Sequence, residues 1–218
     1  MKTVQAMKRG YFITFEGPEG AGKSSQIRML GEALRNAGRE VVITREPGGT
    51  PLAEAIRDVV KGHNTGEIVY PVTELLLIEA ARSQHVREVI KPSLLAGKVV
   101  LCDRFYDSST AYQGGGRGLN IETISMLNSF AADGVVPDLT ILLDLPPERG
   151  FERTETRAET QGEFDRFEEE KLDFHRRVRS EFLALAEREP RRVKVVLADR
   201  EKTEIGRDVL RLVDELIR

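Results

Sequence analysis

Short apolar runs alternate along the chain with longer segments that carry apolar residues every three or four positions. Five apolar runs have the length of strands, and they occupy residues 11–16, 40–44, 98–102, 139–144 and 193–197. Helical spacing occupies residues 24–37, 51–61, 73–96, 121–132, 147–157, 167–188 and 204–218. This alternation predicts an α/β fold in which a parallel five-stranded sheet carries helices on both faces. The strands are apolar throughout, as expected of strands covered on both sides.

Several residues indicate where the predicted helices begin, bend or end. Gly38 ends the first helix, Thr50 is the N-cap of the second, and Pro92 is the expected site of a bend in the long helix over residues 73–96. The chain has no internal repeat and no linker of distinct composition. We therefore predict a single domain covering residues 1–218.

Composition and charge limit the classes of function. The chain has 33 Lys and Arg against 36 Asp and Glu, a formal net charge of -3, which gives no general attraction to nucleic acid or to anionic membranes. Cys102 is the single cysteine, so no intrachain disulfide forms and a reducing compartment is indicated. No signal-peptide pattern occurs in residues 1–10, and no apolar run reaches the roughly 20 residues of a membrane span. We expect a cytoplasmic protein.

The first predicted strand leads directly into a phosphate-binding motif. Residues 17–24 read GPEGAGKS, which matches G-x-x-x-x-G-K-[ST] between a strand and a helix. Glycines let backbone N–H groups turn toward an anion, and the following helix adds its positive N-terminal dipole. Lys23 is expected to reach the phosphates and the Ser24 hydroxyl to bind Mg²⁺. The predicted ATP site comprises Gly17, Pro18, Glu19, Gly20, Ala21, Gly22, Lys23, Ser24 and Ser25.

Three classes of P-loop protein compete for this motif: a phosphotransferase, a switch GTPase and an ATP-driven motor or transporter subunit. The GTPase patterns N-K-x-D and D-x-x-G do not occur in the chain. Asp103 and Arg104 follow the third predicted strand, where ligands of open α/β sheets bind. Asp103 can act near Mg²⁺ and Arg104 can hold a phosphate, although an ordinary strand-end ion pair would also explain the two residues.

Six sequence blocks make the chain resemble the thymidylate kinases. They are FEGPEGAGKS (15–24), TREPGGTP (44–51), AARSQH (80–85), DRF (103–105), SSTAYQG (108–114) and PDLT (137–140). The resemblance covers the chain from residue 11 to the C-terminus. It implies a P-loop nucleoside monophosphate kinase fold with a small lid, and transfer of the ATP γ-phosphate to dTMP, with Mg²⁺, to give dTDP for dTTP synthesis.

The resemblance also implies which residues bind the acceptor nucleotide. Arg57 and Arg104 would hold its phosphate, Arg82 the thymine carbonyl, and Glu19 the 3′-hydroxyl. Tyr112 would lie against the sugar and disfavour a ribose 2′-hydroxyl. The full predicted acceptor set is Glu19, Glu46, Arg57, Ile78, Arg82, Arg104, Ser109, Tyr112 and Gln113.

One position departs from the family pattern. The family commonly has a phenylalanine four residues before the base-reading arginine, and this chain has Ile78 there. Isoleucine offers apolar contact without a π face, so the affinity or orientation of the base is expected to differ.

Arg149, Arg153 and Arg157 recur at i, i+4 spacing on one predicted helix. Like charges at this spacing are destabilising unless an anion lies across them, and a triphosphate would be one. The polar stretch that follows predicts a lid over about residues 153–166, with Arg153 and Arg157 as its catalytic pair by resemblance. A solvated helix face paired to neighbouring glutamates is the alternative.

The predicted catalytic residues are thus Lys23, Arg104, Arg153 and Arg157, and the predicted metal ligands are Ser24 and Asp103. The histidines at 63, 85 and 175 have no ligand spacing, so no transition-metal site is predicted. The expected partners are ATP, dTMP and a second copy of the chain, with residues 73–96 as a candidate interface. A kinase for another nucleotide or nucleoside, and a non-catalytic nucleotide-binding regulatory protein, remain alternatives.

Overall fold

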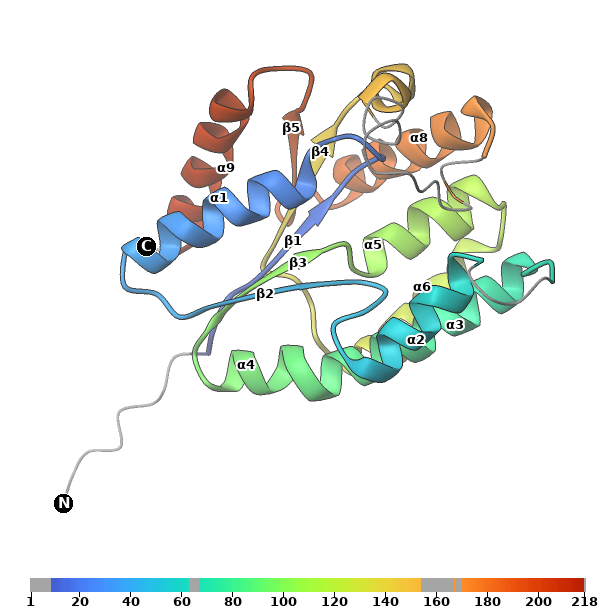
Figure 1. The fold of residues 1–218 in the computed structure, drawn as a ribbon, viewed down its shortest axis with the longest axis horizontal. Coiled ribbons are helices and arrows are strands. Elements are labelled where there is room, and N and C mark those ends of the chain that lie inside the picture. Colours follow the sequence, from blue (N-terminus) through green and yellow to red (C-terminus); the bar gives the residue numbers. More distant parts are fainter. Residues whose placement is uncertain (1–8, 63–66, 154–166, 168–169, 218) are drawn as a thin grey trace.

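A computed structural model describes residues 9–62, 67–153, 167 and 170–217. Its five strands all run parallel, in the order β2-β3-β1-β4-β5 (Figure 1). Their bounds are Phe12–Glu16 (β1), Val41–Arg45 (β2), Val99–Asp103 (β3), Leu139–Asp144 (β4) and Val193–Leu197 (β5). The parallel five-stranded sheet is confirmed, and every strand lies within one residue of its predicted ends.

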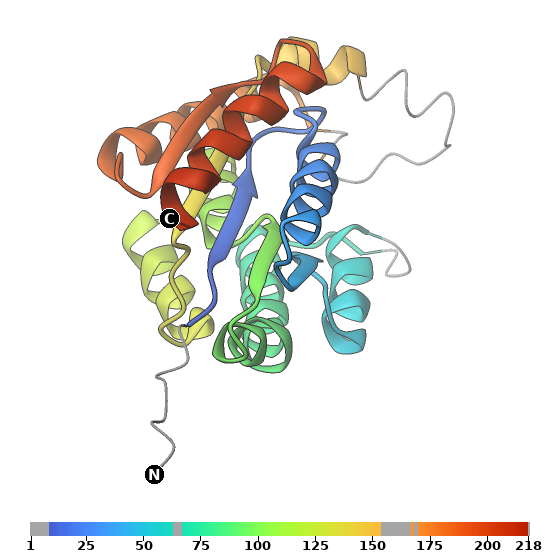
Figure 2. The ribbon, with the colours of Figure 1, turned by 90° about the vertical axis from the view of Figure 1, so that its left-hand side faces the viewer.

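Helices cover both faces of the sheet because neighbouring residues of a strand point to opposite sides. Ile13 and Phe15 pack with α1 (Lys23–Asn36) and α9 (Lys202–Ile217), whereas Phe12 packs with residues 86–94 on the other face. Figure 1 shows α1 and α9 above the strands and α4 (Lys91–Leu95) below them. Figure 2 shows α8 (Leu172–Arg188) beside β5, at the opposite edge of the sheet from β2.

The prediction that the strands are covered on both sides is confirmed for the central strands of the sheet and is wrong for its two edge strands. Strands β1 and β4 are buried at every position and β3 at all but its last, whereas β2 and β5 each expose side chains. An edge strand has a neighbour on one side only, so fewer elements cover it.

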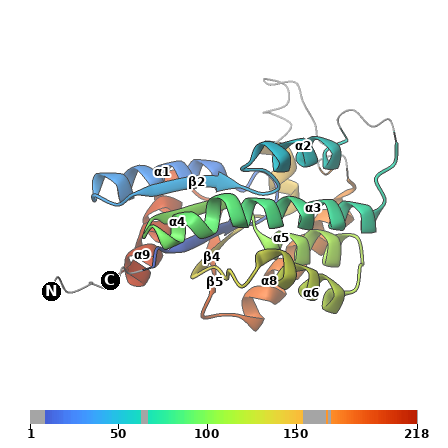
Figure 3. The same ribbon diagram turned by 90° about the horizontal axis from the view of Figure 1, so that it is seen from below.

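The long predicted helix is interrupted earlier than its proline. Helix α3 covers Pro71–His85, a π-helical segment η1 covers Val86–Ile90, and α4 completes the stretch. The irregular register thus lies one turn before Pro92. Figure 3 shows α3 and α4 following each other along one long helical stretch. A proline removes a backbone N–H and crowds the preceding turn, and a wider turn upstream accommodates both.

A helical segment follows β3 in a stretch for which the sequence predicts neither a helix nor a strand. Helix α5 covers Tyr106–Ser109 and continues as the π-helical segment η2 over Thr110–Gly116. Serine, threonine and three consecutive glycines give this stretch low helix propensity, which is why its sequence predicts no helix. Its burial against α8 and α6 (Ile121–Ala132) supplies the stabilisation that propensity lacks.

The remaining helices position groups at one end of the sheet. Helix α2 covers Pro51–Val60, and the Thr50 hydroxyl caps it by accepting from the Ala53 N–H at 3.2 Å, as predicted. Residues 147–153 are helical, after which the described part of the chain breaks off. The predicted lid over residues 153–166, including Arg157, lies outside the described residues except for Arg153.

Candidate active site

The loop between β1 and α1 approaches its neighbours too closely for side chains at two of its glycines. Gly17 has a φ of +131°, and a Cβ there would lie 2.3 Å from the Leu143 carbonyl oxygen. Gly20 has a φ of +73°, and a Cβ there would lie 2.7 Å from the Gly150 carbonyl oxygen. These contacts require glycine and fix the loop above the carboxyl end of the sheet.

Lys23 is held inside this loop. Its Nζ donates to the carbonyl oxygens of Gly17 and Pro18 at 3.0 and 2.9 Å. Burial, with the nearby positive charge of Arg104, lowers the pKa of Lys23. Ser24 Oγ donates to Asp103 Oδ2 at 2.8 Å, so the two predicted metal ligands are adjacent.

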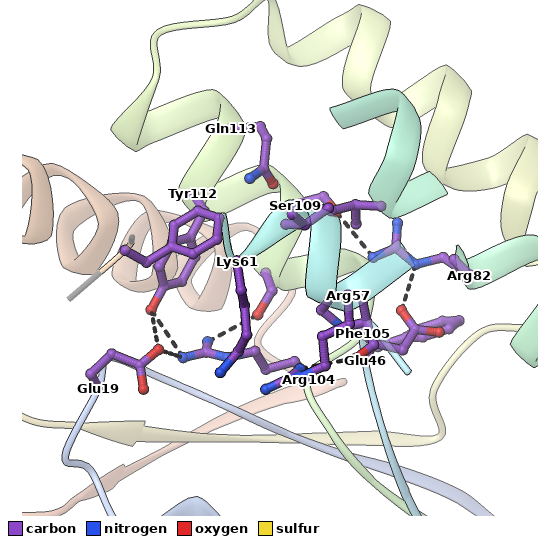
Figure 4. Close-up of a pocket in the computed structure, with 15 residues that line it drawn as sticks. Glu19, Glu46, Arg57, Lys61, Arg82, Arg104, Phe105, Ser109, Tyr112 and Gln113 are labelled. Carbon is purple, nitrogen blue, oxygen red and sulfur yellow. Dashed lines mark hydrogen bonds and ion pairs between the residues drawn. The ribbon is translucent and has the colours of Figure 1, made fainter. Parts of the chain in front are cut away.

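All nine predicted acceptor-binding residues line one cavity beside this loop (Figure 4). They come from the P-loop, the β2–α2 turn, α2, α3, the β3–α5 loop and the α5–η2 segment, which are spread along the sequence. Parallel order explains their convergence, because the strands that precede these elements end at the same edge of the sheet.

Arg104 joins the P-loop to this cavity. Its guanidinium donates to the Gly17 carbonyl at 3.1 Å, to Glu19 Oε1 at 2.5 Å and to the Tyr112 hydroxyl at 3.0 Å. The Arg104 backbone has a φ of +71°, which is unusual for a residue with a side chain. The guanidinium also lies over the Tyr112 ring, 4.8 Å from its centroid.

Arg82 reaches the other end of the cavity from a buried position, where its guanidinium needs polar partners. Its Nε donates to Glu46 at 2.8 Å, its Nη1 to Glu79 at 2.5 Å and to Asn128 at 2.9 Å, and its Nη2 to Ser109 at 3.0 Å. Four of the five guanidinium N–H groups are thereby occupied. Within the described part of the chain, one Nη2 N–H makes no hydrogen bond and can face a ligand, and the surrounding carboxylates keep the pKa of Arg82 above its usual value.

Glu46 is fixed from its other side as well. Its Oε1 pairs with His85 Nδ1 at 3.0 Å, and His85 Nε2 pairs with the Thr44 hydroxyl at 2.6 Å. A carboxylate only accepts, so His85 Nδ1 carries a proton and donates to Glu46. Gln113 is likewise held, since its amide donates to Glu74 at 2.7 Å. The polar lining of the cavity is therefore largely positioned by the protein itself.

Six further residues line the cavity and were missed in the sequence: Pro47, Val60, Lys61, Phe105, Ser108 and Phe167. Phe105 supplies an aromatic ring in a cavity where Ile78 lacks one, and its ring centroid lies 5.4 Å from the Arg82 guanidinium carbon. The phenylalanine of the DRF block is the sequence feature from which this ring could have been predicted. Lys61 could have been found from its spacing, one turn after Arg57 on the same helix.

Glu16 is a further buried carboxylate beside the site. It accepts from the Phe105 N–H at 2.7 Å and from the Ser108 hydroxyl at 2.5 Å. Burial raises the pKa of Glu16 to about 8, and the negative charge of Asp107 adds to the effect. Its position at the end of β1, directly before the P-loop, is the sequence feature from which its place beside the site could have been predicted.

Arg149 and Arg153 share a carboxylate. Both donate to Asp199, at 3.2 Å each, so Asp199 offsets the repulsion expected between two cations one turn apart. Arg153 Nη1 also donates to the Gly20 carbonyl of the P-loop at 3.3 Å. Arg153 thus lies beside the predicted phosphate site, and Arg157 is outside the described residues.

Comparison with known proteins identifies the family. The family model described as "Thymidylate kinase" matches residues 15–209. The chain belongs to the thymidylate kinase family. This membership separates it from the switch GTPases and the ATP-driven motors that share the P-loop motif.

Thymidylate kinases that resemble this chain span nearly its whole length. The thymidylate kinase of Pelotomaculum thermopropionicum is 51% identical over 209 residues, covering 96% of this chain and 95% of the relative. That of Pseudomonas fluorescens is 50% identical over 208 residues, covering 95% and 97%. The crystal structure of thymidylate kinase from Ehrlichia chaffeensis superposes with a TM-score of 0.74 at 34% identity, covering 94% of this chain and 99% of that one.

In this thymidylate kinase family member, the described residues include no group of three or more His, Cys, Asp or Glu placed to hold a metal ion. The hydroxyl of Ser24 and the carboxylate of Asp103 are nevertheless oxygen donors suited to Mg²⁺, which usually keeps several waters and binds nucleotide phosphates. In the described part of the chain no helix combines the length and apolar character of a membrane span.

Proposed function

We propose that this chain transfers the γ-phosphoryl group of ATP to dTMP, giving dTDP. The observation that carries the proposal is the continuous cavity that runs from Arg82 to Glu19 and Arg104, beside the P-loop. Its lining includes the apolar side chains of Ile78 and Phe105 and the cations Arg57, Arg82 and Arg104. An acceptor nucleotide in it would direct its phosphate toward ATP on the P-loop.

The donor would bind through residues 17–25, with Lys23 on the β- and γ-phosphates. Ser24 would hold Mg²⁺ directly, and Asp103 would hold it through water. When bound, the ion would neutralise phosphate charge. Donation from Lys23 Nζ to the carbonyl oxygens of Gly17 and Pro18, at 3.0 and 2.9 Å, supports this role because it holds the ammonium within the phosphate loop.

The acceptor nucleotide would bind along the length of the cavity. Arg82 would donate its remaining Nη2 N–H to a base carbonyl. Ile78 and Phe105 would contact the faces of the base, and Glu19 would accept from the 3′-hydroxyl. Arg57 and Arg104 would hold its phosphate. In-line transfer needs positioning and charge neutralisation rather than a protein nucleophile, and Arg104, Arg153 and Arg157 would supply positive charge to the moving phosphoryl group.

The decisive measurement is coupled ADP release with ATP and Mg²⁺, in which dTMP, dUMP, ribosyl-TMP, dCMP and thymidine are compared as acceptors. We expect strong turnover with dTMP, because the cavity is lined for a base carbonyl and a phosphate. Equal turnover with another acceptor would support the alternative of a different nucleotide kinase. ATP binding with no acceptor-dependent release would support a non-catalytic regulatory protein.

We further propose a homodimer of single-domain chains in the cytoplasm. Helices α3 and α6 pack against each other (Figure 3) and expose apolar side chains one turn apart. Val72 and Leu76 are 57% and 52% exposed on α3, and Met126 and Phe130 are 64% and 82% exposed on α6. A second copy offering the same face would cover them. The lone cysteine, Cys102, supports the reducing compartment.

A further inference from the structure

Arg117 lies at the end of η2 and is not among the described residues that line the acceptor cavity. Its guanidinium donates to both oxygens of Glu74 on α3, from Nε to Oε1 at 3.3 Å and from Nη2 to Oε2 at 3.1 Å. The side chain of Glu74 is 0% exposed and that of Arg117 is 13% exposed. Gln113, which lines the cavity, donates to the same Oε1 at 2.7 Å. The Arg117–Glu74 pair therefore joins η2 to α3 beside the cavity.

The same arginine holds a turn that precedes α8. Arg117 Nη1 donates to the carboxylate of Glu170, and the Glu170 N–H donates to the Phe167 carbonyl oxygen at 3.3 Å. Neither Phe167 nor Glu170 belongs to a helix or strand of the described structure. The placement of this turn therefore depends on contacts with other elements, and Arg117 provides one of them.

Phe167 brings the turn to the cavity. Its side chain lines the cavity and meets the Tyr112 ring edge-on, with the ring centroids 5.8 Å apart and the planes at 85°. The guanidinium carbon of Arg117 lies 5.7 Å from the Phe167 ring centroid and 4.8 Å from the ring centroid of Phe174 on α8. A cation within about 6 Å of a ring centroid is attracted to the ring. Arg117 thus contacts both the turn, through Glu170, and the ring that the turn carries.

We propose that Arg117 is a positioning residue for the acceptor site, which holds Phe167 against Tyr112 so that the two rings form one wall of the cavity. Through Glu74 it anchors this wall to α3, the helix that carries Ile78. The inference rests on the proposed function, because it assigns a residue that shapes the cavity in which dTMP would bind. Tyr112 is the residue expected to disfavour a ribose 2′-hydroxyl, so loss of Phe167 from its edge should weaken that preference.

Neutralisation of Glu74 is a second explanation for Arg117. A buried carboxylate without a cation is costly, so any cation at this position would stabilise the fold. That role would change the free energy of unfolding and would affect all acceptors alike. The position of the Phe167 ring and the preference among acceptors separate the two explanations.

The test uses Arg117→Lys, which keeps a cation beside Glu74 and loses the planar fork that contacts two elements at once. Phe167→Leu and the double variant complete a double-mutant cycle, in which residues that act through one another give non-additive effects. Arg192→Lys is the matched control. Arg192 also pairs with a buried carboxylate, that of Asp107 at 2.6 Å, and also lies over an aromatic ring, but it is not among the described residues that line the cavity.

The Phe167 ring is observed directly by fluorine NMR of the chain labelled with 4-fluorophenylalanine, in which its signal is the one that Phe167→Leu removes. In Arg117→Lys this signal should move toward the chemical shift of exposed rings, because the ring loses its fixed place beside Tyr112. In Arg192→Lys it should stay where it is in the wild type.

For each variant, KM and kcat are measured with dTMP and with ribosyl-TMP as acceptors. We expect Arg117→Lys to raise the KM for dTMP roughly fivefold, to leave kcat within about twofold, and to lower the preference for dTMP over ribosyl-TMP. The double variant should be no worse than the more impaired single variant. Arg192→Lys should leave the KM and the preference unchanged, whatever its effect on stability.

A Phe167 signal that Arg117→Lys leaves in place would overturn the proposal, and so would additive effects of the two substitutions on the KM for dTMP. Absence of ADP release with dTMP from the wild-type chain is a separate result, which rejects the proposed function. The fluorine signal needs no acceptor, so it would still decide whether Arg117 positions Phe167.

Discussion

At the scale of single residues, Glu16 brings together two opposing effects. Two donors at 2.5 and 2.7 Å favour its carboxylate form, while burial disfavours any charge. Burial is the larger effect and places the pKa of Glu16 near 8 in the folded chain, against 4.5 for an exposed glutamate. Near neutral pH the folded chain therefore binds a proton at Glu16 that the unfolded chain does not.

This difference predicts how stability depends on pH. A raised acid pKa gives stability that is fully present below pH 4.5 and is lost as the pH rises to about 8. Urea unfolding between pH 5 and pH 8 should show a Glu16 contribution that declines by up to about 1.4 kcal/mol per pH unit. Glu16→Gln imitates the protonated form, so the variant should lose that part of the slope. A slope unchanged by the substitution would contradict the assigned pKa.

At the scale of elements, α2 is the helix that delivers Arg57 and Lys61 to the cavity, and its start is fixed by one side chain. Thr50 is buried and its hydroxyl satisfies the Ala53 N–H. The first four N–H groups of a helix have no partner within it, so a missing cap leaves a donor unsatisfied in a buried setting.

We expect Thr50→Ala to lower the free energy of unfolding by about 1 kcal/mol. It should also raise the KM for dTMP more than the KM for ATP, because α2 contributes to the acceptor cavity and not to the P-loop. Thr50→Ser keeps the capping hydroxyl and is the matched control. Equal effects of the two substitutions would show that the methyl group, and not the cap, is what matters.

At the scale of the whole molecule, the proposed dimer face makes a prediction about assembly. Phe130→Glu places a charge on the exposed apolar side of α6, where burial against a second copy would be costly. Sedimentation velocity should give a dimer for the wild type and a monomer for this variant. Leu95→Glu, on α4 and 76% exposed, should stay dimeric. A monomeric wild type would contradict the proposal.

The arrangement of the sheet was largely predictable because its causes are local. Apolar runs of strand length alternate with helical patterns, and a parallel sheet covered on both faces buries its central strands completely and its edge strands in part. The π-helical register at Val86–Ile90 and the helix over Tyr106–Gly116 were not predictable from propensity. Both depend on packing partners that are distant in the chain.

The sequence by itself determined the phosphate loop, the family and the residues that line the cavity proposed for the acceptor, because glycines, lysine and arginines in fixed order carry that chemistry wherever they occur. Only the tertiary structure decided how these residues are paired. Arg82 binds both Glu46 and Glu79, Arg104 joins Glu19 to the P-loop, and Asp199 neutralises Arg149 and Arg153. The strength of a charge depends on its neighbours and on its distance from water, and both are fixed only when strands distant in sequence end at one edge of the sheet.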